Sequence, residues 1–123
     1  MQFYDWNTET SRSLTDGYSR GVAVGNRLMM AHVQLEEGAV TAPHSHAYEE
    51  IIYVIFGKWQ VTVDGEEKIL EANQSLVVPP MAEHSSVALE PTLAVVCTDF
   101  RAEWQENSDY WLHYNTENHL WAV

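Results

Sequence analysis

The chain has 123 residues, of which 46% are hydrophobic, which is enough for one globular domain with its own core but too short for two. Eighteen acidic residues against six basic ones give a formal net charge of −12, which repels phosphate backbones and anionic membranes. We therefore expect no nucleic-acid and no membrane partner. No secretory leader pattern opens the chain and no apolar stretch approaches about 18 residues, so a cytoplasmic protein is expected.

The N-terminal region, residues 1–17, has three aromatic side chains among its first six residues and is interpreted as an arm that packs on the body or on a partner chain. Strand patterns begin at Tyr18. The apolar runs 20–24 and 28–35 flank Gly25-Asn26, a dipeptide typical of a tight hairpin. His32 falls on the less apolar face of the second run, where it either lines a cavity or, as we favour, has a structural or exposed position.

A possible metal site is indicated by two histidines one residue apart, His44 and His46, followed by Glu50 and much later by His84. In an extended strand the side chains at 44, 46 and 50 share one face, and this parity favours Glu50 over the adjacent Glu49. Three imidazoles and a carboxylate form an N/O ligand set without a thiolate. The sequence therefore predicts one divalent metal ion, Mn, Fe, Co, Ni or a catalytic Zn, rather than a closed structural zinc.

Further short strands follow these residues. The run Ile51–Phe56 is apolar on both faces, which predicts a central strand covered on two sides or a subunit contact. Asp64-Gly65 is a strong hairpin signal, and the short strand at 76–78 must stop at Pro79-Pro80 because proline lacks the amide donor. A last strand is expected within 93–98. Many short strands separated by turns favour an all-β barrel or sandwich.

We expect the barrel to occupy residues 18–102 and to be followed by an acidic, aromatic tail at 103–123. Aromatic side chains at this density seldom remain solvated. The tail is therefore predicted to pack on the barrel, to cover its mouth or to cross to another subunit. The single cysteine, Cys97, lies in an apolar run and is expected to be a buried, inert thiol.

The spacing of these residues resembles a known family. Gly38, His44-Ser45-His46, Glu50 and Gly57 reproduce the first motif of the cupins, and the step from Pro79 to His84 matches their second motif. Met81 and Ala88 stand where the second motif usually has glycine and asparagine. The resemblance covers about residues 20–100. It implies a double-stranded β-helix barrel of the jelly-roll kind in which His44, His46, Glu50 and His84 bind one metal ion.

Within the cupins, the stretches from Leu28 to His46 and from Val87 to Glu90 resemble small single-domain proteins of pectin and alginate breakdown. Those proteins convert 4,5-unsaturated monouronates to linear keto sugars. They tend to carry glutamine at the position of Glu50, and an aspartate and a phenylalanine where this chain has Val96 and Thr98.

The resulting expectation is a metal-dependent cupin enzyme of isomerase or lyase type that acts on a small polar organic molecule, with an unsaturated uronate or sugar acid as candidate substrate. Tyr48, Asp99 and Arg101 are candidate catalytic groups, because Tyr48 has the parity of the ligands and the other two follow the last strand. One alternative is a metal-dependent dioxygenase on the same barrel, and another is a non-catalytic cupin that only binds a small molecule. A homodimer is expected from the two-faced apolar strand and the aromatic termini.

Overall fold

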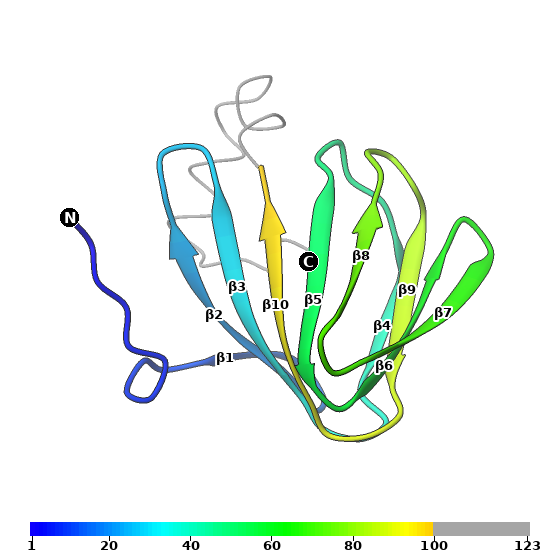
Figure 1. Ribbon diagram of the computed structural model, residues 1–123, viewed down its shortest axis with the longest axis horizontal. Coiled ribbons are helices and arrows are strands. Elements are labelled where there is room, and N and C mark those ends of the chain that lie inside the picture. Colours follow the sequence, from blue (N-terminus) through cyan, green and yellow to red (C-terminus); the bar gives the residue numbers. More distant parts are fainter. Residues whose placement is uncertain (100–123) are drawn as a thin grey trace.

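The computed structural model describes residues 1–99, and all regular structure in this range is β-strand (Figure 1). No helix that could span a membrane is found there. One antiparallel sheet has six strands in the order β1-β2-β3-β10-β5-β8, with bounds β1 Arg12–Thr15, β2 Tyr18–Val24, β3 Met29–Leu35, β10 Thr92–Thr98, β5 Glu50–Phe56 and β8 Gln74–Val78. The other has four strands in the order β4-β9-β6-β7, with bounds β4 Val40–His44, β9 His84–Ala88, β6 Lys58–Val63 and β7 Glu66–Glu71.

The core lies between the two sheets, which confirms the all-β jelly-roll prediction. Strand alternation explains it, because every second side chain of β3 and β10, and of β5 as far as Val54, points inward and is buried. The four-stranded sheet contributes Trp59, Val61 and Leu70 to the core, and each of them is 2% exposed. Full burial of one such side chain stabilises the fold by about 1.5–3 kcal/mol. The interior is therefore a packed core at one end, and the polar site described below occupies the other.

The hairpin predicted at Asp64-Gly65 is confirmed, because both residues have positive φ angles, 47° and 83°, as a two-residue turn of this hand requires. The connection at Gly25 is longer than the predicted tight turn. It runs through four residues to Leu28 and is closed by the Gly25 amide, which donates to the Leu28 carbonyl at 2.7 Å.

The outer face of the six-stranded sheet differs from the sequence expectation in one respect. Cys97 is exposed, so its predicted burial is wrong. The reason is strand parity, since Val96 and Thr98 take the inward positions of β10. On β5, Ile51 and Tyr53 also point outward and are 47% and 40% exposed, so the described residues cover this strand on one face only.

The N-terminal region packs on that outer face through Trp6. Its ring stacks on His32 with centroids 5.1 Å apart and lies against Gly21, where an added Cβ would come within 2.4 Å of the indole. His32 therefore faces away from the barrel interior. The predictions for the tail at 103–123 and for Arg101 lie outside the described residues.

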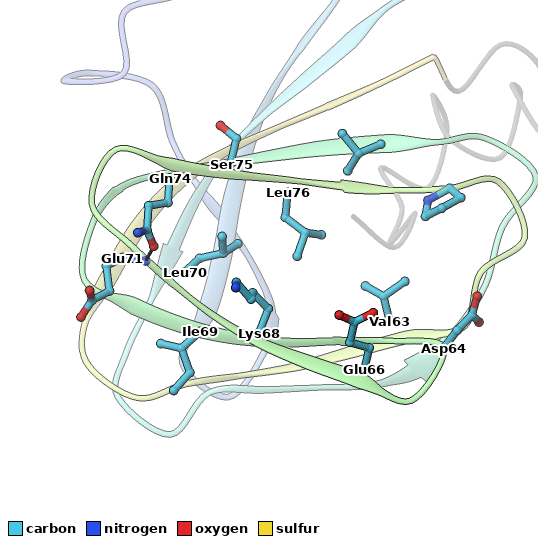
Figure 2. A pocket seen from close by; sticks show the side chains of 12 residues that line it. Val63, Asp64, Glu66, Lys68, Ile69, Leu70, Glu71, Gln74, Ser75 and Leu76 are labelled. Carbon is cyan, nitrogen blue, oxygen red and sulfur yellow. Dashed lines mark hydrogen bonds between the residues drawn. The ribbon is translucent and has the colours of Figure 1, made fainter.

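A cleft of about 1060 Å³ opens between β7 and β8, the edge strands of the two sheets (Figure 2). Leu70 and Leu76 lie deep within it, and Lys68, Glu66 and Glu71 lie around it. None of the three histidines or Glu50 lines this cleft. It lies between two strand edges that do not pair with each other, whereas the four predicted ligands lie at one end of the barrel.

Candidate metal centre

The four predicted ligands come from both sheets and from one loop. His44 ends β4 and lies directly opposite His84, the first residue of β9. His46 lies in the loop between β4 and β5, and Glu50 begins β5 in the other sheet. The single strand face assumed from the sequence is therefore wrong. The chain bends after His46 and crosses between the sheets, and the residues converge across the barrel instead.

The three imidazoles are held in position by backbone carbonyls. The Nδ1 atoms of His44, His46 and His84 contact the carbonyl oxygens of Ala42, Tyr48 and Ala82 at 2.8, 2.7 and 2.9 Å. Such contacts fix the tautomer that leaves Nε2 with its lone pair. One ring nitrogen from each histidine lies within 4.8 Å of the others. This arrangement fits three nitrogen ligands around one ion.

Glu50 completes the set from the opposite sheet. Its side chain is fully buried, whereas Glu49, which precedes β5, is exposed. Its Oε1 lies 2.7 Å from His46 Nε2 and 3.5 Å from His84 Nε2. Its Oε2 and the Nε2 atoms of His44 and His84 are buried without a hydrogen-bond partner among the described residues. Buried polar atoms in this state are costly, and a divalent cation would satisfy all of them.

The electrostatics of the cluster follow from burial and from the mutual contacts. Burial lowers the pKa of His44. Burial alone would raise the pKa of Glu50, but its contacts with His46 and His84 outweigh this and lower it. For His84, burial favours the neutral ring, but the nearby Glu50 carboxylate and the hydrogen bond to the Ala82 carbonyl prevail and raise the pKa. Glu50 is therefore an anion at neutral pH, as a metal ligand must be.

A tight turn between β8 and β9 supports the loop that carries His46. The Met81 amide donates to the His46 carbonyl at 2.8 Å, and Met81 has a φ of 67°. Left-handed backbone of this kind costs an L-residue about 1–2 kcal/mol, which explains why glycine is usual at this position of the motif. The strained turn is retained and connects the two segments that supply His46 and His84.

The predicted catalytic candidates are placed as follows. Tyr48 is buried and stacks on His46 with ring centroids 4.0 Å apart. Asp99 follows β10, pairs with Arg27 at 3.6 Å, and has its Oδ1 buried without a hydrogen-bond partner among the described residues. Arg101 lies outside the described range. Tyr48 thus touches the cluster, and Asp99 follows Thr98, the residue paired with Glu50.

Two interior polar residues carry no motif signal. Tyr18 and Arg20 are 4% and 3% exposed on the inner face of β2. Strand parity offers the one usable sequence signal, because positions 18 and 20 share a face with the buried side chains of β3. Arginine is rare at an inward-facing strand position, so Arg20 stands out there.

Two antiparallel sheets that enclose three histidines and a carboxylate define the class of the protein. The family model of the cupin domain matches residues 31–99, more than half of the chain, and the chain belongs to the cupin family.

Two KdgF proteins are similar to this chain in sequence or structure, and a third protein shares its fold. The pectin degradation protein KdgF of Dickeya dadantii is 31% identical over 101 residues, which cover 80% of this chain and 92% of KdgF. The structure of KdgF from a Halomonas species superposes with a TM-score of 0.75 at 29% identity, covering 80% of this chain and 94% of that one. Salicylate 1,2-dioxygenase from Pseudoaminobacter salicylatoxidans shares the fold, with a TM-score of 0.71 at 20% identity over 78% of this chain and 28% of the dioxygenase.

Proposed function

We propose that this protein is a metal-dependent enzyme that converts an unsaturated uronate to its linear keto form. The observation that carries the proposal is the convergence of three carbonyl-oriented imidazoles on the buried Glu50 carboxylate. The likeness to KdgF, a pectin degradation protein, supports the substrate class. Such a conversion moves protons between oxygen and carbon and needs no external oxidant.

In this proposal His44, His46, His84 and Glu50 hold one divalent metal ion. When bound, the ion supplies Lewis acidity that polarises a carbonyl or hydroxyl oxygen of the substrate. The packing of Tyr48 against His46 holds that imidazole in place and excludes water from one of its faces.

Protons are moved by the polar groups beside the cluster. We assign proton donation to Tyr48, whose ring stacks on His46, and proton acceptance to Asp99, whose Oδ1 is buried. Arg101, two residues beyond Asp99, is assigned to substrate positioning on the sequence alone. In the assay described next, Asp99→Asn should lower kcat and leave the metal content unchanged.

The test combines metal analysis of untagged protein with an assay against 4,5-unsaturated monouronates, followed by loss of ring-conjugated absorbance and by NMR of the product. We expect one bound ion per chain and a linear keto product. Protein that holds one ion and leaves every unsaturated uronate unchanged would refute the enzymatic proposal and favour a binding function.

The alternative on this barrel is oxygen chemistry. It is measured directly by loading the protein with Fe(II) and following dissolved oxygen during turnover. Oxygen uptake stoichiometric with product would replace the isomerase assignment with that of a dioxygenase. We expect turnover to proceed equally well under argon.

A further inference from the structure

The outer face of the six-stranded sheet carries an apolar surface that takes no part in the proposed metal site. It is formed by outward side chains of β10, β5 and β8, and we call it the outer patch: Cys97, Ile51, Tyr53, Ile55 and Val77. Cys97 lies opposite Ile51, and Ile51 lies opposite Val77, so the three strands present these side chains in one row. Ile51 and Val77 are 47% and 55% exposed. A contiguous apolar surface of this kind is typical of a contact site.

The adjoining half of the same face shows how this chain covers such a surface. On β2 and β3 the Trp6 ring, which comes from the N-terminal region, stacks on His32 and lies against Gly21. His32 is opposite Val95 of β10, so the half that Trp6 covers is continuous with the outer patch. Within residues 1–99, an aromatic side chain from outside the barrel thus covers β2 and β3, whereas the outer patch stays exposed.

The segment 100–123, which lies outside the described residues, has the composition and the starting point to cover the outer patch. It contains three of the five tryptophans of the chain, Trp104, Trp111 and Trp121. β10 ends at Thr98, one residue beyond Cys97, so the segment starts beside the outer patch. An extended chain of this length reaches about 80 Å, whereas the three strands of the patch span only about 10 Å. The reach is therefore ample.

Charge and polarity argue against the other arrangements. Each copy of the chain carries a formal net charge of −12, so a second copy placed on the outer patch would be repelled as a whole. The attached segment brings only its own few acidic side chains and loses no translational freedom when it docks. The end of the barrel that holds His44, Glu50 and Asp99 is polar, and tryptophan rings gain more from an apolar surface.

We propose that residues 100–123 dock on the outer patch of the same chain through their tryptophans and cover Cys97. The proposal selects one of the three locations predicted for the tail and is independent of the proposed reaction. It gives the C-terminal segment the role that Trp6 has on β2 and β3. The matched cupin model ends at residue 99, so this cover is an addition to the cupin barrel rather than a part of it.

Cys97 is the reporter for this cover, because it is the only cysteine of the chain and lies in the outer patch. Its alkylation by N-ethylmaleimide is followed by mass spectrometry on the full-length protein. The reagent is uncharged, which avoids repulsion by the acidic surface. The same protein unfolded in urea gives the rate of an uncovered thiol, and we expect the native rate to be at least about tenfold lower. Sedimentation velocity gives the oligomeric state at each protein concentration used.

Two full-length variants change the tail. W111S/W121S removes two of its three indole rings and should restore most of the difference between the native rate and the rate in urea. N107S/N115S changes polar residues of the same segment and should label at the wild-type rate. The two variants therefore separate loss of the aromatic contact from a general effect of substitution in the tail.

Two further variants change the barrel. V77S weakens the outer patch and should raise the labelling rate of Cys97 by a few fold. V40S is its matched control, because Val40 is 56% exposed, almost the same as Val77, but lies on β4 of the other sheet. It should leave the rate unchanged.

A native rate equal to that in urea would overturn the proposal, because nothing would then cover Cys97. Slow labelling that becomes fast when the protein is diluted to monomer would assign the outer patch to a second copy. Slow labelling that persists in W111S/W121S would assign it to another part of the chain, and either result overturns the proposal. If W111S/W121S does not fold, equal rates in V77S and V40S are the contradicting result.

Discussion

The two sheets contribute different chemistry to the same interior. The four-stranded sheet and the loop that leaves it supply three imidazoles, each oriented by a carbonyl within two residues of its own position. The six-stranded sheet supplies the buried charges, Glu50 and Arg20. The histidines and the buried charges therefore come from different sheets. Local backbone contacts orient the three imidazoles, and in the proposed metal site the buried Glu50 carboxylate from the opposite sheet would add the charge that strengthens binding.

The largest expected effect is the loss of metal affinity when one of the three histidines is removed. His46→Ala removes one nitrogen ligand and the ring against which Tyr48 stacks. We expect metal affinity to fall more than about a hundredfold, beyond the usual effect of losing a group that only orients a ligand. Inductively coupled plasma mass spectrometry of dialysed protein measures this.

His32→Ala is the matched control, because that imidazole stacks on Trp6 outside the barrel. It should retain full metal content. Equal metal loss in both variants would show that the cluster has no special role.

Next in size is a change at the connection between the sheets. Gly57 joins β5 to β6 with a φ of 102°, and an added Cβ would lie 2.4 Å from the Pro91 carbonyl oxygen. Gly57→Ala should therefore reduce the free energy of unfolding by about 2–4 kcal/mol. Urea titration measures it. Gly65→Ala, where an added Cβ meets nothing within 4 Å, isolates the cost of positive φ and should lose less.

A substitution that removes the charge of Glu50 tests what the six-stranded sheet contributes to metal binding. Glu50→Gln keeps the shape of the side chain and removes its charge. We expect a loss of about 10–100-fold in metal affinity with the ion still bound at saturation, because the three imidazoles remain. Competition with a fluorescent chelator gives the affinity. Complete loss of binding would mean that the carboxylate, not the histidines, anchors the ion.

The sequence predicts those features of the fold and site that depend on neighbouring residues, and it predicts less where distant segments of the chain meet. Strand alternation predicts the inward side chains of β3 and β5, and the Asp64-Gly65 hairpin follows from local turn chemistry. The spacing of His44, His46, Glu50 and His84 predicts the residues of the candidate site, and the structure brings their side chains together.

Non-local features were not predictable in the same way. The crossing of the chain between His44 and Glu50 depends on which strands pair, and pairing partners leave no mark in a local pattern. Strand parity places Arg20 on the same face as Tyr18, but only the pairing of β2 with β3 shows that this face points inward. Cys97 was misplaced because an apolar run does not state which of its two faces points inward.

Metal binding should depend on pH through His84, whose pKa in the metal-free cluster lies above the ordinary 6.5. Below that raised pKa the ion must displace a proton, so affinity should fall about tenfold per pH unit as the solution becomes more acidic. In metal-free protein the same shift stabilises the fold below pH 6.5, and the stabilisation is lost as the pH rises through the folded-state pKa. Calorimetry in buffers of different ionisation enthalpy reports the released proton.

The Glu50→Gln variant is the control for this dependence. Without the carboxylate that raises the His84 pKa, the onset of weaker binding should move to lower pH. An unchanged onset would assign the proton to another group.

The smallest expected effect is at Met81. Met81→Gly relieves a φ of 67° and should stabilise the protein by about 0.5–1 kcal/mol, or a few degrees in Tm. Calorimetry of the metal-free protein measures it, and metal affinity should be unchanged because the amide that donates to His46 remains. A fall in Tm would show that the Met81 side chain contributes packing that outweighs the strain.

The most direct measurement is X-ray absorption at the metal edge of protein loaded with one equivalent of zinc. Three imidazole nitrogens and at least one oxygen, with the histidine scattering reduced to two rings in His46→Ala, are the result expected from convergence of both sheets on one ion. A spectrum with fewer than three imidazoles in the wild type, or one unaltered by His46→Ala, would contradict it.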